Sequence, residues 1–149
     1  MTDRPDWMGA FGSDGVLIGA TVEDVAARCG GRAVYLATPY SREVVVAGSL
    51  DWGLSMRASV VAAAQIGRLA RAGVTAISPI VMAADACHAD RALDPLDQAF
   101  WSAWCMPLLS ACGLVYVPPL PGWARSRGVC AEIEWAMAHQ VPVLIGEAL

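Results

Sequence analysis

Basic charge is scarce in this sequence, and none of it comes from lysine. All ten basic residues are arginines, and the formal net charge is −4. Binding to the phosphate backbone of nucleic acid needs a basic face, so we expect no nucleic-acid partner. Charged residues make up only 16% of the chain, whereas hydrophobic residues make up 56%. This balance excludes disorder and is typical of a buried parallel sheet, or of a monomer that hides further surface in an oligomer.

Long apolar runs are also missing. No stretch approaches the roughly 20 apolar residues that a membrane-spanning helix needs, so we expect no membrane partner. The first residues, MTDRPDWMGAFGSDG, lack the basic region followed by an apolar core that marks a secretory signal. We therefore expect a cytoplasmic protein.

The cysteines have no metal-binding or disulfide pattern. None of the five belongs to a C-x-x-C pair, and their number is odd. Without a secretory signal, a disulfide framework is not expected. Cys87 and His88 are adjacent but lack a second ligand pair at the spacing of a zinc site. We expect no metal and no redox cofactor.

Strand-like and helix-like segments alternate along the chain, which predicts a parallel α/β sheet with right-handed crossovers. The length suits one compact domain, over residues 33–149, preceded by an extension over residues 1–32 that carries a short helix. Residues 84–96 are expected to be irregular. Strands are expected over 32–41, 74–83, 114–120 and 141–146, and helices over 21–31, 55–73, 98–113 and after residue 126.

Three polar loops follow the first three predicted strands: residues 38–41, 78–82 and 118–127. Ligands of such sheets bind outside the carboxyl ends of the strands, so we expect these loops to meet. The polar residues that they bring together are Thr38, Tyr40, Ser41, Ser78, Arg125, Ser126 and Arg127.

The stretch PGWARSRGVCAEIEWAMA contains a loop–helix junction rich in polar groups. Ser126 is a plausible N-cap, and Gly128 leaves the amides of the first turn open. A helix start with exposed amides and flanking arginines is suited to bind an anion. The alternative is an ordinary capped helix after a loop.

Two carboxylates, Glu132 and Glu134, follow in this helix. Residues two positions apart point about 200° apart on a helix, so the two side chains cannot face the same way. Periodicity favours Glu132 as the inward-facing acid, beside the apolar stripe. The alternative for either is a solvated surface acid.

Three stretches, VYLATPYS, ISPIVMA and LPGWARSRGVCAEIEWA, resemble a bacterial domain family of unknown function. That family is related to the nucleoside 2-deoxyribosyltransferases and the nucleoside-monophosphate N-glycosidases. The most specific part is Gly122-Trp123 followed by Ser126-x-Gly128-x-x-x-Glu132. The resemblance implies a flavodoxin-like, Rossmann-like fold, with a doubly wound parallel sheet of about five strands in three layers. It also implies a homodimer or homotetramer.

The resemblance further implies chemistry at the N-glycosidic bond of a nucleoside or nucleoside 5′-monophosphate. Glu132 would attack the anomeric carbon, and Ser126 would hold a 5′-phosphate. Tyr40 would either hydrogen-bond Glu132, keeping it ionised and oriented, or be a simple turn aromatic. The expected substrate-binding residues are Thr38, Pro39, Ser41, Ser78, Trp123, Arg125, Ser126, Arg127 and Gly128.

One departure from the usual pattern of these related enzymes concerns two aspartates near the third strand, of which the first binds sugar hydroxyls or assists the leaving group. Cys105 and Gly113 occupy these positions. The candidates to substitute are Asp85, Asp90, Asp94 and Asp97. If none of them substitutes, the alternative to an enzyme is a protein that binds nucleotide without turning it over. A third reading is a structural subunit whose apolar surface serves assembly.

Overall fold

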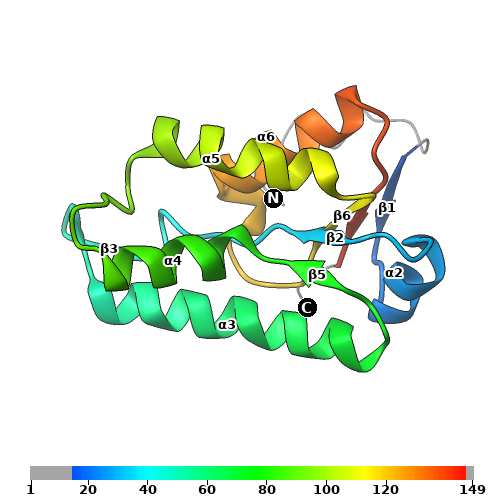
Figure 1. Ribbon diagram of the computed structural model, residues 1–149, viewed down its shortest axis with the longest axis horizontal. Coiled ribbons are helices and arrows are strands. Elements are labelled where there is room, and N and C mark those ends of the chain that lie inside the picture. Colours follow the sequence, from blue (N-terminus) through cyan, green and yellow to red (C-terminus); the bar gives the residue numbers. More distant parts are fainter. Residues whose placement is uncertain (1–14, 147–149) are drawn as a thin grey trace, which may run out of the picture.

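Five short parallel strands form the central sheet (Figure 1). The computed structural model describes residues 15–146. The strands run in the order β1–β7–β6–β2–β5, and every neighbouring pair is parallel. Their bounds are Val16–Ile18 (β1), Val34–Leu36 (β2), Ala76–Ile77 (β5), Leu114–Val117 (β6) and Val143–Ile145 (β7). The predicted α/β, Rossmann-like sheet of five strands is confirmed.

Helices cover both faces of the sheet, because alternate residues of each strand point to opposite sides. In β2, Tyr35 belongs to the core under α5 and α6, whereas Val34 and Leu36 belong to the core against α2 and α3 (Figure 1). The three layers follow from this division. The helices are α2 (Val22–Arg28), α3 (Trp52–Arg71), α4 (Pro79–Ala89), α5 (Gln98–Ala111) and α6 (Arg127–Ala138).

The edge strand β1 is a feature that the sequence did not predict. It pairs with β7, and the amide of Ala20 donates to the carbonyl of Ile145 at 3.0 Å. Helix α2 follows with the predicted N-cap, Thr21, and its Val25 is fully buried. The described part of the expected extension is therefore integral to the sheet; residues 1–14 lie outside the described residues. Three residues are too few for a strand pattern to be recognised.

The strand predicted over residues 74–83 is wrong in its second half. Strand β5 ends before Ser78, which caps α4 by accepting a hydrogen bond from the amide of Val81 at 3.2 Å. Pro79 suits the first helical position. The segment predicted as irregular, 84–96, is consequently helical in its first part. Short apolar runs do not distinguish a buried strand from a buried helix.

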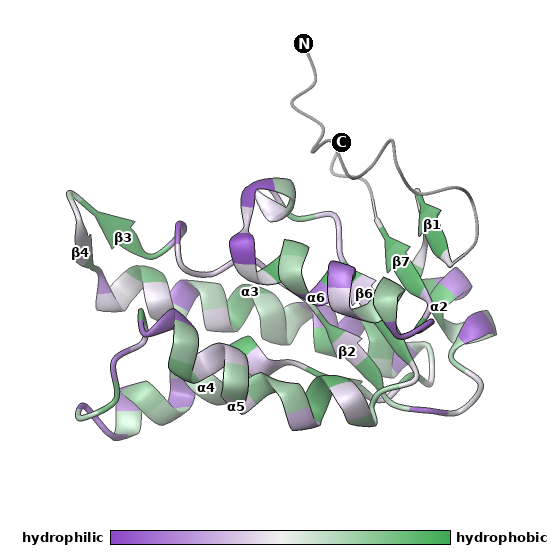
Figure 2. Cartoon of the chain, turned by 90° about the horizontal axis from the view of Figure 1, so that it is seen from above, coloured by the Kyte–Doolittle hydropathy of each residue, from purple (hydrophilic) through white to green (hydrophobic). Residues whose placement is uncertain are grey.

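A small antiparallel hairpin, β3 (Val45–Val46) and β4 (Ser49–Leu50), links β2 to α3 and projects at one end of the molecule (Figure 2). Helix α3 then begins earlier than predicted, because Asp51 caps it through the amide of Leu54 at 2.8 Å. Among residues 15–146, no helix is both long and apolar enough to cross a membrane.

Candidate functional site

A cavity of about 560 Å³ lies beyond the carboxyl ends of β2 and β6. Its walls come from the loop after β2, from α4 and α5, and from the start of α6. Both the size and the place are usual for a small-molecule site in an α/β protein. Eight predicted site residues line it: Thr38, Pro39, Tyr40, Ser41, Ser126, Arg127, Gly128 and Glu132.

Three predicted site residues do not reach this cavity. Ser78 is buried as the N-cap of α4. Trp123 packs into the core under α6, as part of the short 3-10 helix η1 (Trp123–Arg125). Arg125 ends η1 and is exposed. The three loops therefore converge as expected, but with fewer side chains than predicted.

Helix α6 presents Glu132 to the cavity and Glu134 to solvent, as periodicity predicts. The buried face of the helix carries Val129, Ile133 and Ala136. Glu132 flanks this face and is partly buried, whereas Glu134 is exposed on the other flank.

The hydrogen-bond partner of Glu132 is Tyr35, not Tyr40. The hydroxyl of Tyr35 donates to Oε1 of Glu132 at 2.5 Å. Tyr40 instead shares a 2.7 Å hydrogen bond with Ser55 of α3, so of the two roles considered for Tyr40 the bond to Glu132 is wrong. In the sequence, Tyr35 is one residue of the strand predicted over 32–41, and only the need of a buried tyrosine hydroxyl for a partner could have marked it.

Burial and this hydrogen bond act on Glu132 in opposite directions. Burial raises the pKa of Glu132, and the bond from Tyr35 lowers it; the net pKa is about 7, against an ordinary 4.5. The pKa of Tyr35 is raised as well, first by burial and then by the charge of Glu132. Tyr35 is therefore a protonated donor, and Glu132 changes charge near neutral pH.

Cys105, at the first of the two positions where the resemblance predicts an aspartate, lines the same cavity. Its thiol interacts with the hydroxyl of Tyr35, and burial raises its pKa. It is thus a neutral thiol beside the tyrosine that holds Glu132. Gly113, at the second aspartate position, lies beside Arg32, whose side chain is 2.8 Å from where a Cβ would stand.

None of the four candidate aspartates lines the cavity within the described part of the chain. Asp97 caps α5, and Asp85 accepts a hydrogen bond from Ser59. Asp90 and Asp94 accept from backbone amides two residues ahead. All four therefore have local structural roles, and the predicted substitution is not found among them.

The start of α6 forms a cationic corner of the cavity. Ser126 is the predicted N-cap and accepts from the amide of Val129 at 3.3 Å. Arg127 and Arg42 both line the cavity, and neither forms an ion pair within residues 15–146. Backbone amides at a helix start favour an anion, and so do guanidinium groups that form no ion pair among the described residues.

Thr38 contributes an unsatisfied hydroxyl. The residue is only 6% exposed, and its Oγ1 has no hydrogen-bond partner among the described residues. Because buried hydroxyls normally have a partner, this group is suited to bind a polar atom of a ligand in the cavity.

A second cavity carboxylate, Glu43, was not singled out from the sequence. It follows β2 in a turn, in which its amide donates to the carbonyl of Tyr40 at 2.9 Å. Its Oε1 lies 2.6 Å from where a Cβ of Gly122 would stand. The carboxylate of Glu43 therefore occupies space that is available only because residue 122 is a glycine. No sequence pattern marks a single acid in a loop.

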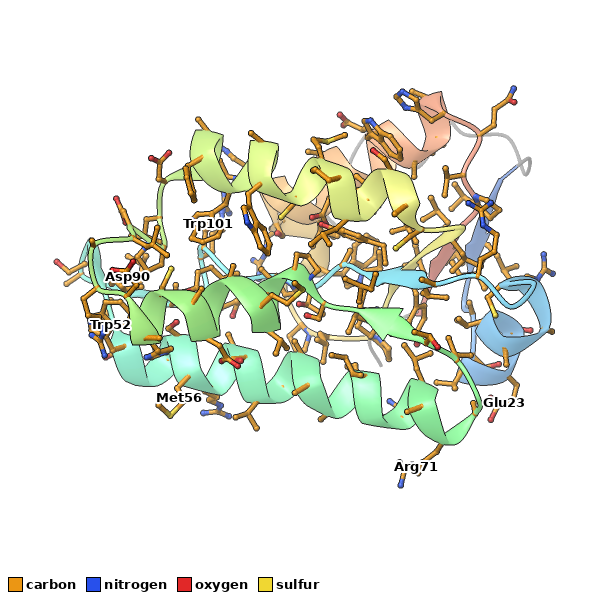
Figure 3. The ribbon with its side chains drawn as sticks, viewed as in Figure 1. Glu23, Trp52, Met56, Arg71, Asp90 and Trp101 are labelled. Carbon is orange, nitrogen blue, oxygen red and sulfur yellow. The ribbon has the colours of Figure 1, made fainter. Side chains whose placement is uncertain are left out.

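The opposite wall is largely apolar and comes from α4 and α5. Trp101 lies between these helices (Figure 3), and its indole N–H donates to the carbonyl of Asp94 at 2.8 Å, which fixes the ring. Gln98 and Ser102 add polar groups one turn apart. This wall is suited to a flat, partly polar group such as a nucleobase.

The described residues contain no group of three or more His, Cys, Asp or Glu side chains placed to hold a metal ion.

Comparison with known proteins identifies the family but no characterised relative. None of the curated proteins compared with this chain matches it. The family described as "Domain of unknown function (DUF1937)" matches residues 32–148, which include every cavity residue, and the chain therefore belongs to that family.

Proposed function

We propose that this protein cleaves or transfers the N-glycosidic bond of a nucleoside or nucleoside 5′-monophosphate, with Glu132 as the nucleophile. The observation that carries the proposal is the carboxylate of Glu132, bonded to Tyr35, in a cavity whose corner is suited to a phosphate. The motif resemblance to the deoxyribosyltransferases and N-glycosidases supports the same chemistry.

In the first step, an oxygen of Glu132 forms a bond to the anomeric carbon C1′. The C1′–N bond breaks, its electron pair stays on the base nitrogen, and the base leaves. In the second step, water or another base attacks C1′, and the ester to Glu132 breaks with return of the carboxylate. The proton that the attacking group loses balances the proton that the departed base takes up. A carboxylate nucleophile divides a difficult substitution into two easier ones, through transition states that an anion stabilises.

The corner at Ser126 holds the 5′-phosphate in this proposal. Arg127 and Arg42 neutralise its charge, and the amides at the start of α6 bind its oxygens. The sugar then lies over Glu132, and the base lies against Trp101 on the opposite wall. Holding the substrate at both ends supplies the proximity that the first step needs.

The test is to incubate the purified protein with a panel of nucleosides and 5′-monophosphates and to measure free base by chromatography. We expect release from at least one substrate, loss of release in Glu132→Ala, and no change in Glu134→Ala, the matched acid on the solvent side of α6. Mass spectrometry of the intact protein should detect the glycosyl adduct on Glu132. No release from any substrate contradicts the proposal.

A second candidate is a nucleotide-binding protein without turnover, and one observation favours it. Cys105 places a neutral thiol where the resemblance to the deoxyribosyltransferases and N-glycosidases predicts a carboxylate. For this candidate, a 5′-monophosphate raises the melting temperature, but no base appears, and Glu132→Ala keeps the stabilisation.

A further inference from the structure

We infer that Glu43 recognises the sugar, by accepting a hydrogen bond from the 3′-hydroxyl of a bound nucleoside 5′-monophosphate. This inference rests on the proposed function and names the part of the substrate that the site selects.

The carboxylate of Glu43, an exposed residue, lies against the segment before α6. Its Oε1 lies 2.6 Å from where a Cβ of Gly122 would stand, and Gly122 has a φ of +86°. Gly122 precedes η1, which leads directly to the N-cap Ser126. The carboxylate of Glu43 therefore lies against the segment that leads to the corner that we assign to the phosphate, and both line the same cavity.

The 3′-hydroxyl is the sugar hydroxyl closest to that corner. In a furanose, C3′ is bonded to C4′, which carries the 5′-phosphate arm, whereas C1′ lies across the ring and faces Glu132. A group near the phosphate corner is thus closer to the 3′-hydroxyl than to the 2′-hydroxyl.

The chemistry of the cavity also points to Glu43 for this contact. Among the described residues, Glu43 and Glu132 are the carboxylates that line the cavity, and Glu132 is needed at C1′. An ionised carboxylate only accepts hydrogen bonds, so it pairs with a hydroxyl and not with a phosphate oxygen. Arg42, its neighbour in the chain, offsets repulsion from the phosphate. The unpartnered hydroxyl of Thr38 is a second group in the cavity that is suited to the sugar.

A substrate pair that differs only in this hydroxyl tests the inference. Base release is measured for a 2′-deoxynucleoside 5′-monophosphate and its 2′,3′-dideoxy counterpart, with wild type and Glu43→Ala. For wild type, removal of the 3′-hydroxyl should lower kcat/KM by about 10- to 100-fold, as for a hydrogen bond to a charged group. In Glu43→Ala, the two substrates should react at nearly equal, low rates.

Two controls make the result specific. Glu134→Ala should keep the full preference of wild type for the 3′-hydroxyl. Glu43→Gln, which retains one accepting oxygen, should keep part of it. If Glu43→Ala discriminates between the substrates as strongly as wild type does, the inference is wrong, while the proposed function stands. If wild type releases no base from either substrate or from the wider panel, the proposed function fails and the inference fails with it.

Discussion

Tyr35 and Glu132 are 97 positions apart in the sequence, and a 2.5 Å hydrogen bond joins the tyrosine hydroxyl to Oε1 of the carboxylate. The bond connects the middle of β2 to the cavity face of α6. It satisfies a buried phenol and fixes one carboxylate oxygen. The nucleophile that we propose is therefore oriented from the interior of the sheet and not from a loop.

Replacing Tyr35 should change the pKa of the Glu132 carboxylate. In Tyr35→Phe, the donor is lost while burial remains, so the pKa of Glu132 should rise above its wild-type value of about 7. We expect base release near neutral pH to fall about 10-fold or more, with partial recovery at alkaline pH. The measurement is kcat/KM as a function of pH.

Tyr40→Phe is the matched control for that variant. It removes the hydroxyl that bonds Ser55 and should cost about 1 kcal/mol of stability. Its pH profile should keep the wild-type midpoint. Equal shifts in the two variants would mean that the Tyr35 bond has no special effect on Glu132.

Local patterns predicted the parts of the site that depend on one segment. The cap at Ser126 and the opposite directions of Glu132 and Glu134 follow from helix geometry alone. The role of Tyr35 depends on which helix covers which face of β2, and that is settled only by the tertiary arrangement. Glu43 is similar, since its neighbour Gly122 is distant in sequence and next to it in space.

The activity of the wild-type protein should depend on the ionisation of Glu132. A nucleophilic carboxylate must be deprotonated, and its pKa is about 7 because burial outweighs the bond from Tyr35. Base release should therefore increase as the pH rises through about 7, instead of having a midpoint near the ordinary carboxyl value. A rate that is already constant from about pH 5 upward would mean that the pKa of the nucleophilic carboxylate is not raised by the site.

The same raised pKa should lower stability as the pH increases. Between the ordinary value of 4.5 and about 7, the unfolded chain loses the proton of Glu132 while the folded protein retains it. The contribution of the Glu132 carboxyl to the free energy of unfolding is fully present below pH 4.5 and is lost as the pH rises through about 7. Glutamine accepts the Tyr35 bond without ionising. The free energy of unfolding of Glu132→Gln, relative to that of wild type, should therefore be about 2 kcal/mol higher at about pH 8.5 than at about pH 5.

Urea unfolding of the two proteins at both pH values measures this difference. Glu134→Gln is the control, because that carboxylate is exposed. If the free energies of unfolding of Glu132→Gln and wild type differ by the same amount at both pH values, folding does not shift the pKa of Glu132.

Gly122 should be required for the position of Glu43 as well as for the backbone. Gly122 and Gly48 both have positive φ, +86° and +81°, but only Gly122 has the Glu43 carboxylate where a Cβ would stand. Alanine at either position should cost about 1–2 kcal/mol in urea unfolding, because L side chains disfavour this conformation. Only Gly122→Ala should also displace Glu43 and lower kcat/KM towards that of Glu43→Ala. If Gly122→Ala instead retains the kcat/KM of Gly48→Ala, the contact between Glu43 and Gly122 does not position a group that binds substrate.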